Sequence, residues 1–255
     1  MPSLSALLFD VDGTLADTER AHLEAFNAAF AEARLDWHWS VSLYTDLLAV
    51  TGGKERIRHY IDRHQPEFKL PPDADALIAG LHAAKTRIYL DLLNRGAIGL
   101  RPGVKRLFQE ARAEGLRLAI ATTTTPANVT VLLENTLGPD GTDWFEVIGA
   151  GDVVPRKKPA PDIYLYVMER MGVEPASCIA FEDSRGGVDA AREAGLKTIV
   201  TCNDFTRGHD FDGAAIVLDH LGEPDLPFKV VAGDAQGKTY VDLDLVRRIH
   251  GRDPH

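Results

Sequence analysis

The 255-residue chain is 45% hydrophobic and 26% charged, a composition typical of a globular protein with room for one large α/β domain or two smaller ones. Its 28 basic and 38 acidic residues give a formal charge of -10, which argues against nucleic acid or an anionic membrane surface as a partner. Any phosphate-binding site must therefore be locally basic within an acidic protein.

The first expected element is a buried strand that ends at Phe9 and is followed directly by Asp10, Asp12 and a Gly-Thr turn. Residues two apart at a strand end point the same way, so both carboxylates can act on one reacting centre, as nucleophile and as proton donor. An ordinary turn or helix cap is the alternative. Because this strand begins at about Leu4 and no apolar run approaches the ~20 residues of a membrane span, we expect no signal segment and a cytoplasmic location.

The segment from about Ala16 to Arg95 has helical rather than strand periodicity. It is too long for a βα loop and too regular for a linker. We therefore predict a helical cap domain over residues 16–95, inserted into an α/β core formed by residues 1–15 and 96–255. The insertion point lies directly after the two aspartates, at the strand ends where doubly wound sheets bind ligands.

Five further apolar runs have the length of strands and lie at 116–122, 145–150, 177–182, 197–202 and 214–219. Helical patterns alternate with the later runs, which predicts an α/β fold with a doubly wound, Rossmann-like parallel sheet. The C-terminal extension, 226–255, is expected to form a hairpin around Asp234 to Gly237 and then one or two helical turns, with no evident chemistry. Cys178 and Cys202 lie at apolar stretches, so we expect two buried, reduced thiols.

Threonines follow the second expected strand, in "ATTTTPAN". The hydroxyl of Thr122 and the backbone N–H of Thr123 can bind a phosphoryl oxygen at a helix N-terminus. Helix capping is the alternative for this run, and it suits Thr125, before Pro126, better than it suits Thr122.

Charged residues mark the next two helix starts. Lys158, chosen over Lys157, stands before "PAPD" and can balance the charge of phosphate and aspartate, although such a run is often a solvated basic patch. Glu182 and Asp183 end a strand before a glycine-rich turn, where they can join Asp10 around Mg²⁺ or act as helix caps.

The motifs DxDGT, Thr, Lys-Pro and Glu-Asp, in this order at successive strand ends, resemble those of the haloacid dehalogenase superfamily. The resemblance implies phosphoryl transfer in which Asp10 attacks phosphorus while Asp12 protonates the leaving oxygen and then activates water. Thr122 and Lys158 complete the catalytic set. The resemblance also implies that Mg²⁺ is bound by Asp10, by the backbone carbonyl of Asp12 and by Asp183, with Glu182 as a further ligand or an orienting group.

The segments "DVDGTLADTERAHLEAFN", "TGGKERI", "HAAKT" and "KKPAPDIY" more narrowly resemble CbbY-type proteins encoded with Calvin-cycle genes. That subfamily removes a phosphate from xylulose-1,5-bisphosphate, an inhibitor of Rubisco. The resemblance implies that the cap binds the substrate, and the candidate residues are Glu19, His22, Tyr44, Gly52, Gly53, Lys54, Arg56 and Lys85.

Within that set, the "GGKER" backbone with Lys54 and Arg56 suits the distal phosphate, and Lys85 is expected at the same group. Glu19 and His22 are expected near the sugar hydroxyls. The alternatives to substrate binding are that the lysines and the arginine are solvated cations on helix surfaces and that Tyr44 packs in the core.

Two other functions compete with a phosphatase. A phosphosugar mutase of the β-phosphoglucomutase type would use the same aspartates, Mg²⁺ and cap, and the motif residues alone do not exclude it. A phospho-acceptor signalling module is disfavoured by the DxD pair and by the cap. We expect a small-molecule sugar phosphate as the partner and a monomeric protein.

Overall fold

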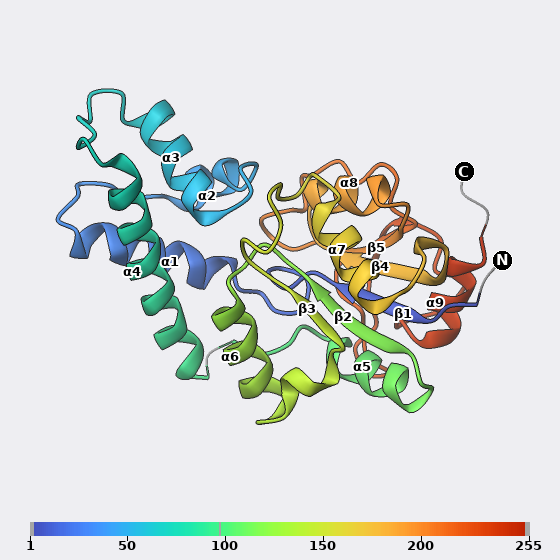
Figure 1. Ribbon diagram of the computed structural model, residues 1–255. Coiled ribbons are helices and arrows are strands. Elements are labelled where there is room, and N and C mark those ends of the chain that lie inside the picture. Colours follow the sequence, from blue (N-terminus) through green and yellow to red (C-terminus); the bar gives the residue numbers. More distant parts are fainter. Residues whose placement is uncertain (1–2, 97, 253–255) are drawn as a thin grey trace. The chain divides into compact units, whose positions relative to one another are not determined.

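The computed structural model describes residues 3–96 and 98–252, and contacts divide these residues into two units (Figure 1). The α/β unit contains the described residues up to Asp17 and from Ile98 onward. The helical unit contains those from Thr18 to Gly96.

A seven-stranded sheet with the order β3-β2-β1-β4-β5-β6-β7 forms the centre of the α/β unit. The strands are β1 (Ala6–Phe9), β2 (Arg117–Ala121), β3 (Val147–Gly149), β4 (Cys178–Glu182), β5 (Lys197–Thr201), β6 (Ile216–Leu218) and β7 (Val230–Gly233). The six strands that the apolar runs predicted pair in parallel, so the predicted fold class is confirmed. Every residue of β1 and β4 is buried, as expected for central parallel strands covered on both faces.

Helices cover both faces of this sheet (Figure 1). They are α5 (Val104–Ala113), α6 (Pro126–Leu137), α7 (Asp162–Met171), α8 (Arg185–Glu193) and α9 (Leu243–His250), with 3₁₀ turns at Gly141–Trp144 and Pro175–Ser177. Alternate residues of β1 serve the two faces: Leu8 belongs to a core cluster with Ile163 of α7, whereas Phe9 packs edge-on against Phe108 of α5. Because β1 to β6 pair in parallel, their carboxyl ends share one edge of the sheet.

The predicted hairpin in the C-terminal extension is wrong, although the predicted helix is present as α9. The strand before the turn, β7, pairs antiparallel with β6. Among the described residues after the turn no second strand forms: the Thr239 carbonyl accepts from the backbone N–H of Phe228, which precedes β7, and the side chain of Asp242 accepts a hydrogen bond from the backbone N–H of Leu245 and starts α9. The extension thus adds an antiparallel edge strand to the sheet.

The helical unit consists of α1 (Glu19–Glu32), α2 (Val41–Leu47), α3 (Gly53–His64) and α4 (Ala74–Asn94). Its core is aromatic: Trp39 packs against Phe26, Phe30 and Tyr60, with ring centroids 4.6, 5.0 and 5.3 Å away. The backbone of Trp39 is fixed by two hydrogen bonds with the Asn27 side chain, at 2.8 and 2.9 Å. This segment therefore has a hydrophobic core of its own.

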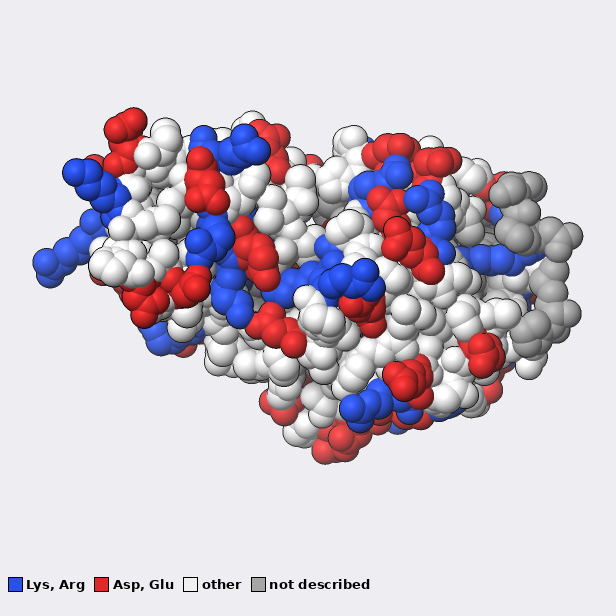
Figure 2. Space-filling view, turned by 45° about the horizontal axis from the view of Figure 1, so that its top comes forward, with Lys and Arg blue, Asp and Glu red and all other residues white. Residues whose placement is uncertain are grey.

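Two further features of the chain concern its cysteines and its helices. Cys178 and Cys202 are both buried and free, as predicted. Within the described residues, no helix is both long and apolar enough to cross a membrane. On the face displayed in Figure 2, basic side chains are interspersed with acidic ones.

Candidate active site

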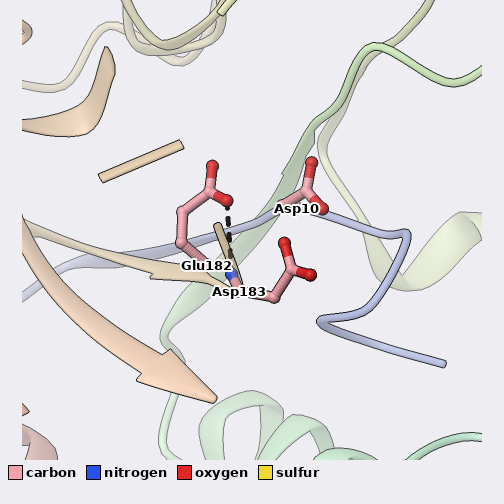
Figure 3. Close-up of side chains that lie close together, drawn as sticks. All are labelled: Asp10, Glu182 and Asp183. Carbon is pink, nitrogen blue, oxygen red and sulfur yellow. Dashed lines mark hydrogen bonds between the residues drawn. The ribbon is translucent and has the colours of Figure 1, made fainter. Parts of the chain in front are cut away.

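The acidic motifs meet at the carboxyl edge of the sheet because β1 lies between β2 and β4. Asp10 follows β1, Glu182 is the last residue of β4, and Asp183 comes next. All three are buried, and one oxygen from each carboxylate lies within 4.8 Å of the other two (Figure 3). The structure thus brings these three predicted residues into one cluster.

Lys158 is the cation of this cluster. Its buried ammonium donates to Asp10 Oδ1 at 2.7 Å, to Glu182 Oε1 at 2.6 Å and to the carbonyl of Ala121 at 2.8 Å. Lys157 instead pairs with Asp152, an exposed surface acid, at 2.9 Å. Lys157 is thus paired with a surface acid, whereas Lys158 belongs to the buried cluster and is not part of a solvated patch.

The charge states of the cluster follow from burial and mutual attraction. Burial raises the pKa of Asp10 to about 7, because loss of hydration outweighs the favourable charge of Lys158, and Glu182 adds to the rise. Burial alone would lower the pKa of Lys158, but the charges of Asp10 and Glu182 raise it above its usual range. Lys158 is therefore a permanent ammonium, while Asp10 can exist as acid or carboxylate near neutral pH.

Two glycines make the close approach of the acids possible. Gly13 has a φ of 82°, and a Cβ there would lie 2.1 Å from Asp183 Oδ2. A Cβ on Gly187, in the first turn of α8, would lie 1.9 Å from Glu182 Oε2. Both motif glycines are thus needed to leave space for carboxylates.

This donor set fits Mg²⁺, since hard carboxylate oxygens converge where the Gly13 backbone leaves room for them. The capping alternative for the acids is wrong, because Ser184 caps α8 by accepting from the backbone N–H of Gly187 at 3.2 Å. Asp12 is half-buried in the turn after β1 and is not among the three clustered carboxylates.

The threonine segment lies at the end of β2. Thr122 is buried; its backbone N–H donates to Gly149, and its hydroxyl accepts from the backbone N–H of Thr124 at 3.3 Å, so the hydroxyl proton can serve another acceptor. Thr123 is half-buried in the bend that follows. Thr125 occupies the N-cap of α6, as its sequence position suggests, but its side chain makes no capping hydrogen bond.

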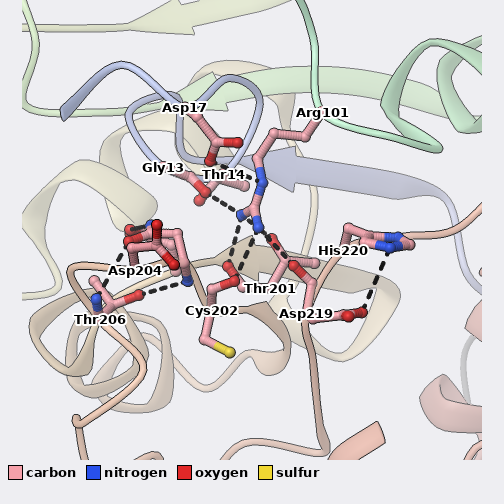
Figure 4. A network of polar contacts seen from close by, with 12 residues as sticks. Gly13, Thr14, Asp17, Arg101, Thr201, Cys202, Asp204, Thr206, Asp219 and His220 are labelled. Carbon is pink, nitrogen blue, oxygen red and sulfur yellow. Dashed lines mark hydrogen bonds and ion pairs between the residues drawn. The ribbon is translucent and has the colours of Figure 1, made fainter. Parts of the chain in front are cut away.

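Three residues of the α/β unit touch this site and were missed in the sequence. The hydroxyl of Tyr164, on α7, donates to Glu182 Oε1 at 2.5 Å. Asn203, after β5, donates from Nδ2 to Asp183 Oδ2 at 2.8 Å. Arg101 contacts the loop after Asp12 (Figure 4). The position of Asn203 at a strand end was the one signal in the sequence that could have pointed to it.

Within the helical unit, Glu19, Tyr44 and Arg56 form one polar group. The Tyr44 hydroxyl donates to Glu19 Oε2 at 2.6 Å and accepts from Arg56 Nη1 at 3.3 Å, while the Tyr44 ring is fully buried. Packing and hydrogen bonding therefore both fix Tyr44.

A second polar group joins α1 to α4. Lys85 is buried, its Nζ lies 2.7 Å from His22 Nδ1, and the His22 ring stacks on Tyr89. The ammonium also lies over the rings of Phe26 and Tyr89. Lys85 and His22, both predicted to bind the substrate, thus lie in contact with each other.

The glycines of "GGKER" begin α3. Gly52 is the N-cap with a φ of 98°, a backbone conformation that favours glycine. A Cβ on Gly53 would lie 2.6 Å from the ring of His82. Lys54 is half-buried in the first turn of this helix.

The haloacid dehalogenase-like hydrolase family matches residues 4–195. Protein CbbY from Cupriavidus necator is 50% identical over 248 residues, which are 97% of each chain. Protein CbbY from Rhodobacter capsulatus is 52% identical over 83% of this chain and 91% of its own. A solved structure of CbbY from Rhodobacter sphaeroides, its D10N mutant in complex with xylulose-(1,5)bisphosphate, is 43% identical over 85% of this chain and 94% of that chain, with a TM-score of 0.80.

Proposed function

The chain belongs to the haloacid dehalogenase-like hydrolase family, and from this premise we propose that it is a Mg²⁺-dependent sugar-bisphosphate phosphatase that works through an aspartyl-phosphate. The observation that carries the proposal is the buried cluster in which Lys158 bridges Asp10 and Glu182, with Asp183 beside these two acids. Such a carboxylate is shielded from water, and its charge is balanced by a fixed cation.

In the first step, a carboxylate oxygen of Asp10 attacks phosphorus and the bond between phosphorus and the sugar oxygen breaks. Asp12 donates a proton to the departing oxygen, so the sugar leaves as an alcohol. Lys158, at 2.7 Å from Asp10 Oδ1, holds the nucleophile and balances its charge. The hydroxyl of Thr122 and the backbone N–H of Thr123 bind phosphoryl oxygens.

In the second step, Asp12, now a carboxylate, takes a proton from water as that water attacks the phosphorus of the aspartyl-phosphate. The bond between phosphorus and the Asp10 oxygen breaks, which releases inorganic phosphate and restores the free carboxylate. Asp10, the Asp12 carbonyl, Asp183 and Glu182 would hold Mg²⁺, whose chemistry is to neutralise the charge shared by phosphate and carboxylate.

The proposed substrate is xylulose-1,5-bisphosphate. The proposal is supported by the 43% identity to the Rhodobacter sphaeroides CbbY that was solved with this sugar bisphosphate. We propose that the helical unit is the cap and that its candidate residues bind the distal phosphate and the sugar hydroxyls. Those residues are Glu19, His22, Tyr44, Gly52, Gly53, Lys54, Arg56 and Lys85.

The test is phosphate release with Mg²⁺ from xylulose-1,5-bisphosphate, ribulose-1,5-bisphosphate, fructose-1,6-bisphosphate and glucose 1-phosphate, with the sugar products analysed in parallel. The proposal predicts strong preference for the xylulose compound and one phosphate released per sugar consumed. Isomerised phosphosugar without net phosphate would identify a mutase, and equal rates on all four compounds would refute the proposed specificity.

A further inference from the structure

Arg101 is a buried arginine that the proposed mechanism does not use. Its guanidinium donates to the backbone carbonyls of Thr201 and Cys202, both at 2.8 Å, of Asp219 at 2.6 Å, and of Gly13 (Figure 4). These carbonyls come from three separate segments: the turn after β1, the end of β5 and the residue after β6.

An arginine is required for this pattern. Its planar fork presents five N–H donors in fixed directions, whereas a lysine ammonium has three donors around one point. Nε of Arg101 also lies 3.1 Å from Asp17 Oδ1, but the Asp17 side chain is 68% exposed. Solvent weakens that ion pair, so the buried carbonyls are the main partners.

One of these carbonyls belongs to the catalytic turn. Gly13 follows Asp12 directly, and its Cα is so close to Asp183 that no Cβ fits between them. A hydrogen bond from Arg101 to the Gly13 carbonyl therefore fixes the turn that carries Asp12 and also the backbone against which the Asp183 carboxylate rests.

Two other carbonyls, those of Thr201 and Cys202, directly precede Asn203. The Asn203 side chain cannot rotate freely, because its Oδ1 accepts from the backbone N–H groups of Phe205 at 2.9 Å and Thr206 at 3.2 Å. Its Nδ2 consequently points at Asp183 Oδ2, 2.8 Å away.

We propose that Arg101 is a positioning residue of the metal site: it ties the turn after Asp12 to the segment before Asn203, and so holds Asp183 and the Asp12 backbone in place for Mg²⁺. The inference rests on the proposed function for the identity of the cation. Residues that orient metal ligands typically change metal affinity by about 10- to 100-fold when they are altered.

The experiment measures Mg²⁺ binding to the full chain by titration calorimetry for wild type and for Arg101→Lys. The matched control is Arg106→Lys. Arg106 likewise donates to two backbone carbonyls, those of Gly222 at 2.8 Å and Val241 at 3.0 Å, but these belong to the C-terminal part of the chain. Circular dichroism and thermal unfolding establish that each variant is folded at the temperature used.

We expect Arg101→Lys to weaken Mg²⁺ binding by about 10-fold or more, and Arg106→Lys to leave it unchanged. Excess Mg²⁺ should restore kcat in Arg101→Lys, with KM for the sugar phosphate unaltered. Because the variant is shown to be folded before Mg²⁺ is added, this rescue reports metal affinity and not refolding. Unchanged Mg²⁺ affinity in folded Arg101→Lys, or equal losses in both variants, would overturn the proposal.

Should Arg101→Lys fail to fold, Asn203→Ala takes its place in the same titration, with the same expected loss. Unchanged Mg²⁺ affinity in Asn203→Ala would then refute the proposed coupling. The titration needs no substrate, whereas the proposed function is judged by phosphate release from wild type, so failure of one can be told from failure of the other.

Discussion

Replacing Lys158 with methionine removes the cation of the catalytic cluster at nearly constant side-chain length. The ammonium lies 2.7 Å from Asp10 and 2.6 Å from Glu182, and all three side chains are buried, so the change leaves two carboxylates close together without a countercharge. Removing one partner of a buried ion pair costs about 3–5 kcal/mol, a large part of the about 5–15 kcal/mol that stabilises a typical protein.

This cost depends on pH with a definite sign. Without Lys158, the folded-state pKa of Asp10 rises above its wild-type value of about 7, because the positive charge of Lys158, which lowers it, is gone. A carboxyl whose folded pKa exceeds its unfolded pKa destabilises the protein as pH rises between the two values. Lys158→Met should therefore lose more stability at pH 8 than at pH 5.5.

Urea unfolding of Lys158→Met and wild type, measured at both pH values, checks this prediction, and Lys157→Met is the control. Lys157 pairs with Asp152, whose side chain is 59% exposed, so its loss should cost less than about 1 kcal/mol at either pH. Equal losses in the two variants, or a loss in Lys158→Met that does not grow with pH, would refute the electrostatic account of the cluster.

Three further predictions concern the same cluster. Tyr164→Phe removes a hydrogen bond to a buried carboxylate and should lower the free energy of unfolding by about 1.5–3 kcal/mol. Tyr166→Phe on the same helix should have little effect, and similar losses of unfolding free energy in the two variants, measured in urea, would contradict this prediction. Because the pKa of Asp10 is raised to about 7, Mg²⁺ binding at lower pH must displace a proton from this carboxyl. Calorimetry should therefore show Mg²⁺ affinity falling by up to about ten-fold per pH unit below 7, and an affinity that stays constant would contradict this prediction. Gly13→Ala places a methyl group 2.1 Å from a carboxylate oxygen and should abolish Mg²⁺ binding, while Gly237→Ala, with a similar φ but open space around it, should not; normal binding by Gly13→Ala would disprove the need for glycine.

The central part of the fold and of the site could be predicted from the sequence because both depend on short-range patterns. Asp10, Glu182 and Asp183 each stand directly at the end of an apolar run. Parallel strands place such ends at one edge of the sheet, so the convergence of these acids follows from the strand pattern and the sheet order. Lys158 could be chosen over Lys157 only through the adjacent Pro-rich helix start.

Other features depend on tertiary contacts that leave no local signal. The acceptors of Arg101 are backbone carbonyls, which carry no residue-type information. The partner of Lys85 is His22, which lies 63 positions away on another helix. The C-terminal hairpin was mispredicted because a turn signal shows where the chain reverses but not which strand accepts the edge, and here β6 pairs with β7.

The most direct test of the account is a search for the aspartyl-phosphate itself. Wild-type protein is mixed with Mg²⁺ and xylulose-1,5-bisphosphate, quenched in acid within one turnover, digested and examined by mass spectrometry, with folded Asp10→Asn as the control. The covalent mechanism predicts a phosphorylated peptide with the modification on Asp10, and neither this peptide nor phosphate release in Asp10→Asn. Substantial phosphate release by Asp10→Asn, or modification of another residue, would contradict the covalent mechanism.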